Sequence, residues 1–142
     1  MAAVVLRADV GEDLLDVAEL AALVDQAAAG AVVTFAGVVR DHDGGRAVSE
    51  LSYSAHPTAS AVVAQVAADV AARAGGVRAI AVSHRVGKLA IGDVALACAV
   101  AADHRREAFE TCAELVDEVK RLLPVWKQQT FADGTDEWVN ST

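Results

Sequence analysis

The chain has 142 residues, a length that fits a single domain (residues 1–142) able to bury its own core. Its 12 Lys and Arg residues against 20 Asp and Glu give a formal net charge of −8, which argues against general attraction to nucleic acid or anionic membranes. Apolar residues make up 54% but aromatic residues only 4%, so we expect a closely packed interior of Ala, Val and Leu. No apolar run approaches the roughly 18 residues of a membrane span, and the start lacks a signal-peptide pattern.

The two cysteines, Cys98 and Cys112, are too far apart for a CxxC site, and one pair is no disulfide framework. We therefore expect both to be reduced core residues of a cytoplasmic protein.

The first third of the chain predicts a strand, a helix and a second strand. The strand lies near Val4–Leu6. Apolar residues at helical spacing predict a helix over Asp13–Ala29, and Gly30 is a natural residue to end it. The β-branched segment Ala31–Val39 predicts a strand that is apolar on both faces.

The alternating segment Ala47–Ser54 predicts a strand that forms a hairpin with Ala31–Val39. The connection between them, Arg40–Arg46, is rich in glycine and charge, so we expect an exposed and mobile loop.

Pro57 suits the first turn of a helix, which is predicted over Ala59–Ala74. Two strands follow. On Val77–Val86, His84 shares the apolar face, so we interpret it as a satisfied core residue. On Val94–Ala102, one face consists of alanines, which would let a helix pack closely.

A long helix is predicted from the N-cap Asp103 to the stop at Pro124. At about 100° per residue its apolar stripe contains Lys120. The stripe consists of Phe109, Cys112, Ala113, Val116 and Leu123. Two interpretations remain open: the lysine stem covers apolar surface while the ammonium reaches water, or the amine serves chemistry in a partly desolvated pocket.

The order of these elements predicts an α+β fold, a two-layer domain with a mostly antiparallel sheet and three main helices. The sequence has no P-loop, dinucleotide-binding, HExxH or nucleophile-elbow motif. No two of His42, His84 and His104 share ligand spacing on one element, so we expect no metal site.

The remaining candidates for chemistry are basic residues. His104 and Arg105 occupy the first turn of the last helix, where they form either a solvated helix start or a phosphate site. Arg40 follows the predicted strand Ala31–Val39. It is either a simple surface charge or a bidentate hydrogen-bond donor to a phosphate. Lys127 follows the proline stop, so it can turn back toward Lys120.

The chain contains, in this order, the blocks GAVVTFAGVVRDHDGG (Gly30–Gly45), SHRVGKLAIGD (Ser83–Asp93), DHRREAF (Asp103–Phe109), VKRLLPVWKQQ (Val119–Gln129) and EWV (Glu137–Val139). Together these blocks resemble the large, catalytic subunit of molybdopterin synthase. The resemblance implies an α/β hammerhead fold and a homodimer with a small ubiquitin-like subunit at each end, a heterotetramer. It also implies a sulfurtransferase that converts cyclic pyranopterin monophosphate into the dithiolene of molybdopterin, with sulfur from the thiocarboxylated C-terminus of the small subunit and no permanently bound cofactor.

The resemblance further implies a substrate pocket near the dimer interface, with Lys120 and Lys127 as catalytic residues. The substrate-binding positions would be Val38, Val39, Arg40, His104, Arg105, Lys120, Lys127, Gln128 and Gln129. We assign the phosphate to Arg40, His104 and Arg105. The family usually has another basic residue and a glutamate where Gln128 and Gln129 stand.

His104 and Lys120 are about 24 Å apart along one helix, by the rise per residue. If both serve one pocket, the dimer must bring the helix start of one chain to the helix end of the other. The alternative function is a non-catalytic anion-binding or assembly module of the same fold.

Overall fold

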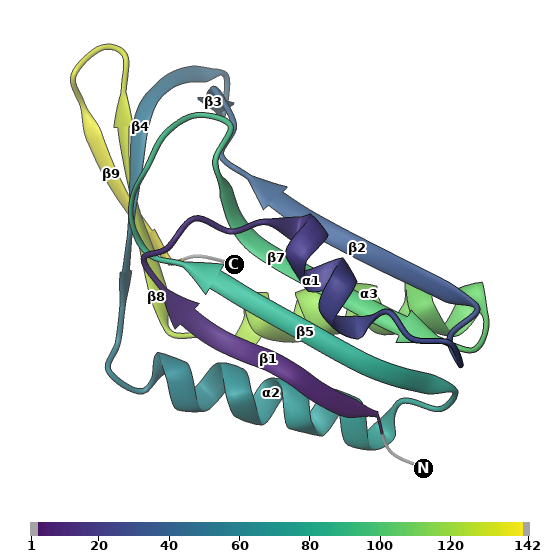
Figure 1. Ribbon diagram of the computed structural model, residues 1–142. Coiled ribbons are helices and arrows are strands. Elements are labelled where there is room, and N and C mark those ends of the chain that lie inside the picture. The colour runs from purple at the N-terminus through teal and green to yellow at the C-terminus, as the bar shows by residue number, and fades with distance from the viewer. Residues whose placement is uncertain (1–2, 141–142) are drawn as a thin grey trace.

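The computed structural model describes residues 3–140, which form two sheets and three helices (Figure 1). The strands are β1 (Val4–Gly11), β2 (Ala31–Val38), β3 (His42–Asp43), β4 (Arg46–Ala55), β5 (Val77–Arg85), β6 (Gly87–Leu89), β7 (Val94–Ala102), β8 (Val125–Phe131) and β9 (Asp136–Asn140). The helices are α1 (Val17–Val24), α2 (Ala59–Arg73) and α3 (Arg105–Leu122). All strand pairs except β1 with β5 are antiparallel, so the predicted α+β class is confirmed.

The first sheet has the strand order β1-β5-β7-β2 and helices on both faces. Helices α2 and α3 cover one face, and the short α1 covers the other (Figure 1). Beneath α2 and α3 lie larger side chains, including Ile80, Val82 and Val100. On the opposite face Leu20 and Val24 of α1 pack on alanines, namely Ala79, Ala81, Ala97, Ala99 and Ala101. The predicted close packing of a helix on an alanine face is confirmed. The small methyl side chains of these alanines let the backbone of α1 approach the sheet closely.

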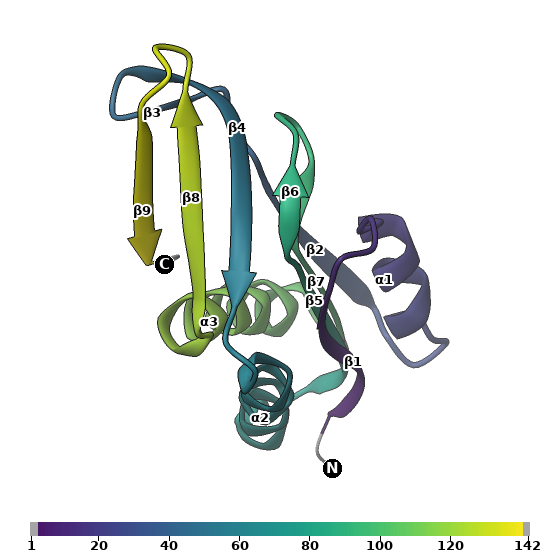
Figure 2. The same ribbon diagram turned by 90° about the vertical axis from the view of Figure 1, so that its left-hand side faces the viewer.

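The second sheet has the order β3-β4-β8-β9, with β6 paired to the same β4. Figure 2 shows β4, β8 and β9 side by side beyond the ends of α2 and α3. Strands β3 and β4 form a hairpin in which Gly44 and Gly45 have φ of 58° and 80°. Two positive φ values suit a type I′ turn, which glycine adopts without steric cost. The segment expected to be a loop therefore contains a tight hairpin of its own.

The predicted hairpin between Ala31–Val39 and Ala47–Ser54 is wrong. Strand β2 pairs with β7 in the first sheet, whereas β4 pairs with β3, β6 and β8 in the second. Alternation of apolar residues shows that a segment can form a strand, but it does not specify the partner. Here the seven residues between the two strands let the chain leave one sheet and enter the other.

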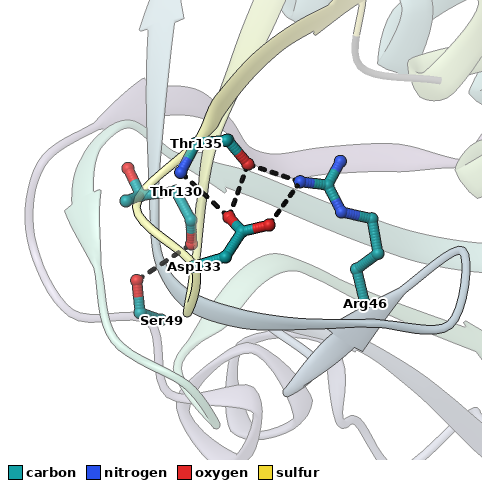
Figure 3. Close-up of polar contacts among 5 residues, drawn as sticks. All are labelled: Arg46, Ser49, Thr130, Asp133 and Thr135. Atoms are coloured by element: carbon teal, nitrogen blue, oxygen red, sulfur yellow. Dashed lines mark hydrogen bonds and ion pairs between the residues drawn. The ribbon is translucent and has the colours of Figure 1, made fainter.

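Polar side chains hold the start of β4 against the turn between β8 and β9 (Figure 3). Arg46 contacts the Asp133 carboxylate at 3.3 Å and also donates to the Thr135 hydroxyl. The Ser49 hydroxyl donates to the carbonyl oxygen of Thr130 at 3.0 Å. Hydrogen bonds from Thr135 hold the pKa of Asp133 below its usual value. These contacts are exposed, so they fix the alignment of the strands more than they stabilise the fold.

Helix α1 is shorter than predicted. It begins after the N-cap Asp16, whose carboxylate accepts a hydrogen bond from the amide of Ala18 at 2.9 Å, and it ends at Val24.

The interpretation of Gly30 as a helix end is wrong. Its amide donates to the carbonyl of Ala102, and a Cβ there would lie 2.4 Å from the Asp103 carbonyl oxygen. Glycine is needed for this close approach of two backbones.

Helix α3 ends before Pro124 as predicted, but its N-cap is His104 and not Asp103. The Asp103 carboxylate instead accepts a hydrogen bond from Arg78 at 2.6 Å. The predicted apolar stripe is rotated from the true one: Phe109 is 62% exposed and Lys120 is also exposed. The buried face consists of Ala108, Thr111, Cys112, Leu115, Val116 and Val119. Helical spacing allowed either orientation, and packing on β7 and β2 decided between them.

No helix within residues 3–140 is long and apolar enough to cross a membrane.

Leu115 and Leu122 offer a matched test of the core. Leu115 is completely buried, while Leu122 on the same helix is 44% exposed. We expect Leu115→Ala to lower the free energy of unfolding by about 2–5 kcal/mol, because it leaves a cavity. Leu122→Ala should cost much less. Urea denaturation of both variants measures the difference, and equal losses would contradict this packing.

Candidate functional site

A pocket of about 280 Å³ opens where the two sheets meet the end of α3. Strands β2, β4, β5, β7 and β8 contribute to its walls together with α3. Its lining residues are Gly37, Val38, Arg40, Tyr53, His84, Ala95, Leu96, Val119, Lys120, Leu123, Val125 and Lys127. The site is therefore assembled from segments that are far apart in the sequence.

Lys120 and Lys127 reach this pocket from opposite sides of the Pro124 stop. Helix α3 ends at Leu122, and β8 starts at Val125, so the chain reverses within two residues. Leu123 and Val125 are 5% and 2% exposed, which anchors the reversal in the core. The expectation that Lys127 turns back toward Lys120 is confirmed, since both side chains line one pocket.

The pocket is positive although the protein is strongly negative. Arg40, Lys120 and Lys127 line it, and no Asp or Glu among residues 3–140 does. Cationic donors that converge in a partly enclosed space favour an anion, because each charge-assisted hydrogen bond is stronger there than in water. The arrangement suits a phosphate or carboxylate ligand.

Arg40 is held at the mouth of the pocket by a polar chain. Its guanidinium lies 3.5 Å from the carboxylate of Asp43 in β3. The same carboxylate accepts a hydrogen bond of 2.6 Å from the amide of Gln129 in β8. This hydrogen bond, with the positive charges of Lys127 and Arg40, holds the pKa of Asp43 below its usual value. Asp43 thus stays a carboxylate that links Arg40 to the second sheet.

Three of the predicted substrate-binding residues near the pocket face elsewhere or only support it. Val39 is 5% exposed and packs against Leu51 and Leu89, so it does not line the pocket. Gln129 is 3% exposed and holds Asp43. Gln128 lies on the face of β8 opposite Lys127, because neighbouring residues of a strand point to opposite sides. Val38 does line the pocket.

His104 and Arg105 lie in a separate shallow depression at the start of α3. Its other lining residues are Arg106, Glu107, Phe109 and Glu110. Neither His104 nor Arg105 lines the pocket of Lys120. As the length of the helix led us to expect, the two ends of α3 in one chain are poorly placed to share one small substrate.

The sequence interpretation of His84 was correct but incomplete. The residue is 5% exposed, as expected of a core position, yet it also lines the pocket. Tyr53 lines the pocket too and meets His84 edge-to-face with ring centroids 5.0 Å apart. The strand pattern gave no signal for this role, because the predicted strand Val77–Val86 continues the same apolar face to Val86.

The cysteines lie outside the pocket. Both are free and buried, and burial raises the pKa of each thiol, that of Cys112 to about 11. A protonated, enclosed thiol is a poor nucleophile, so neither residue is placed to carry a reactive sulfur. Among residues 3–140, no group of three His, Cys, Asp or Glu side chains could hold a metal ion.

Comparison with known proteins places these observations in a family. A family model described as "MoaE protein" matches residues 10–122. A Nostoc protein named molybdopterin synthase catalytic subunit is 37% identical over 127 residues, which is 89% of this chain and 77% of that protein. A Pyrococcus abyssi protein of the same name is 38% identical, over 87% of this chain and 83% of the relative. The crystal structure of molybdopterin synthase from Staphylococcus aureus superposes with a TM-score of 0.85 and 26% identity, over 93% of this chain and 96% of that one.

The hydrogen bond between Asp43 and Gln129 yields a prediction about the pH dependence of stability. Gln129→Glu would place two carboxylates in contact in a partly buried position, which raises the pKa of the pair. A carboxyl group whose pKa is higher in the folded than in the unfolded protein lowers the free energy of unfolding at pH values above that pKa. The loss becomes smaller as the pH falls. We therefore expect a lower thermal midpoint than wild type at pH 8, and a smaller deficit at pH 5.

The exchanged double variant Asp43→Asn with Gln129→Glu is the matched control. It restores one carboxylate and one amide with the roles reversed, so we expect most of the lost stability to return. Thermal unfolding of both variants at the two pH values measures the effect. If the double variant is as unstable as Gln129→Glu, the contact between positions 43 and 129 does not stabilise the fold.

Proposed function

This chain belongs to the MoaE protein family, and we propose that it is the catalytic subunit of a molybdopterin synthase. In this proposal it transfers sulfur from the thiocarboxylated C-terminus of a small ubiquitin-like subunit to cyclic pyranopterin monophosphate, and the product is the dithiolene of molybdopterin. The observation that supports it best is the pocket itself, where Arg40, Lys120 and Lys127 converge. A cyclic phosphate and a thiocarboxylate are both anions that such a pocket attracts.

The reaction sets tasks that these side chains can perform. For each of the two sulfur atoms of the dithiolene, a carbon–sulfur bond forms on the pyranopterin and a carbon–oxygen bond there breaks, and one of these breakages opens the cyclic phosphate. Each transfer also breaks the acyl–sulfur bond of one thiocarboxylated tail, and water supplies the oxygen that restores the tail carboxylate. We assign the phosphate to Arg40, and proton transfer or covalent contact with the substrate to Lys120. Lys127 then holds the substrate or polarises the acyl carbon. The pyranopterin is a substrate here and not a permanently bound cofactor.

The tail of the small subunit would enter the pocket from outside. A Helicobacter pylori structure described as the complex of subunits 1 and 2 of molybdopterin-converting factor shares the fold, with a TM-score of 0.65, 20% identity and coverage of 98% of this chain and 89% of that one. Its description supports a two-subunit assembly for the fold. The reduced cysteines favour the cytoplasm as the place of the reaction.

A second copy of the chain would complete the site, which gives a homodimer and, with two small subunits, a heterotetramer. An apolar groove runs between β2, an edge strand, and α3. The exposed ring of Phe109 lines both this groove and the depression that holds His104 and Arg105. The depression, the groove and the pocket thus follow one another along α3.

Two-fold packing of one such groove on another, about an axis perpendicular to α3, would run the two α3 helices in opposite directions. The helix start of one copy then lies beside the helix end of the other. In this arrangement His104 and Arg105 of one protomer supply phosphate contacts to the pocket of its partner, which the structure of one chain does not provide.

The rival function is a non-catalytic anion-binding or assembly module with the same fold. An assay with thiocarboxylated small subunit and cyclic pyranopterin monophosphate distinguishes the two. The proposed function predicts dithiolene product, and a formed complex without product would favour the rival.

In that assay, Lys120→Ala should lower turnover by at least about a hundredfold, as expected when a proton-transfer group is lost. The control is Lys88→Ala, since Lys88 is an exposed lysine that pairs with Glu50 away from the pocket. It should keep nearly wild-type activity. A Lys120→Ala protein with normal turnover would reject the role given to this amine.

The shared site predicts complementation between two inactive variants. In a heterodimer of a Lys120→Ala protomer with an Arg105→Ala protomer, one pocket combines both defects and the other is intact. Purified by two different tags, this heterodimer should recover about half of wild-type turnover, because one of two symmetric sites is restored. If Arg105 acts within its own chain, both pockets stay defective and no activity returns.

A further inference from the structure

His84 lies in the pocket without a task in the reaction described above. It is the penultimate residue of β5, and its side chain is only 5% exposed. The pocket nevertheless includes it among the lining residues, together with Lys120. A polar side chain on the inner wall of a small pocket must either hydrogen-bond to the protein or meet the ligand.

The contacts of the ring determine which nitrogen carries the proton. Nδ1 lies 2.8 Å from the carbonyl oxygen of Arg85. A carbonyl oxygen only accepts, so Nδ1 must donate, and in a neutral imidazole Nε2 then keeps a free lone pair. The edge-to-face contact with Tyr53, at an interplanar angle of 84°, holds the plane of the ring.

The surroundings keep this ring uncharged at neutral pH. Burial lowers the pKa of His84 to about 4; the hydrogen bond to Arg85 opposes the shift, and the positive charge of Lys120 adds to it. The titratable and charged groups that line the same pocket are Arg40 from the segment after β2, Tyr53 from β4, Lys120 from α3 and Lys127 from β8. Three of these are cations, and no carboxylate of the described residues lines the pocket to favour an imidazolium.

We propose that His84 is a specificity-determining residue whose Nε2 accepts a hydrogen bond from an N–H or O–H group of the bound pyranopterin. The inference rests on the proposed function and deepens it. Arg40, Lys120 and Lys127 offer only donors, so they match the anionic end of the substrate. Nε2 offers an acceptor, so it matches the donor-bearing ring system, and the two kinds of partner orient the substrate in one direction.

This orientation has an energetic consequence. A ligand without a donor at that position leaves Nε2 buried and unpaired, which is costly. The pocket therefore discriminates against pyranopterin analogues in which that donor is methylated or absent, even when they keep the phosphate.

The first test observes the ring directly. Nitrogen-15 NMR of the histidine rings in the intact protein, between pH 5.5 and 8, should show His84 as the Nδ1–H tautomer with no titration in this range. Addition of cyclic pyranopterin monophosphate should shift the Nε2 resonance. An Nε2–H tautomer or an imidazolium at pH 7 would overturn the proposal without any reference to substrate.

The second test compares binding of cyclic pyranopterin monophosphate by calorimetry. His84→Phe keeps the ring contact but has no acceptor, and its affinity should fall about tenfold, the loss expected when a buried donor goes unpaired. His84→Gln can place an amide oxygen near the position of Nε2 and should recover most of that loss. The control is Ser83→Ala: Ser83 is as buried as His84, points to the opposite face of the strand and bonds to Asp9.

The outcomes separate the two proposals. Wild-type affinity in His84→Phe, or a loss in His84→Gln as large as in His84→Phe, would overturn the role of Nε2. Failure of the wild-type protein to bind the pyranopterin would contradict the proposed function itself, and with it the ligand assigned to His84. Thermal unfolding of each variant confirms that it is folded before binding is measured.

Discussion

The reversal of the chain between α3 and β8 is the constraint on which the site depends. Pro124 has no amide hydrogen and disfavours helical geometry at Leu123, so the helix must end there. The carbonyl of Pro124 accepts a hydrogen bond of 3.0 Å from the amide of His56, which ties the reversal to the end of β4. Because of this tie, the last turn of α3 and the first residues of β8 face the same space between the sheets. Lys120 and Lys127 converge there without any local sequence motif.

The distribution of charge complements this geometry. A formal net charge of −8 repels polyanions from the surface as a whole, yet three cations gather in one pocket of about 280 Å³. Asp43 lies just outside the lining residues and holds Arg40 from behind. Since Gln129 satisfies the other oxygen of that carboxylate, Asp43 positions the arginine while leaving the interior of the pocket positive. A small anion is thereby favoured over a large one.

Gln129 and His84 show why the roles of site residues were harder to predict than their identity. The sequence predicts Gln129 as a substrate contact and His84 as a core residue. The structure gives Gln129 a supporting role, because its partner Asp43 lies 86 positions away in the chain and no periodicity reveals such a pairing. His84 has the burial that its strand pattern predicted, but its access to the pocket depends on where α3 and β8 leave a gap. Such gaps arise from the packing of several elements together.

The sequence by itself determined most of the secondary structure, the alanine face that receives α1, the end of α3 at Pro124 and the family. These follow from local rules of periodicity, proline geometry and side-chain size, which act over a few residues. The tertiary structure decided the separation of β2 and β4 into two sheets, the rotation of α3 that exposes Phe109 and Lys120, and which residues line the pocket together. Those features depend on which of several possible burial patterns removes the most apolar surface from water at once. That choice is made by all the elements together, and for this reason no single segment could reveal it.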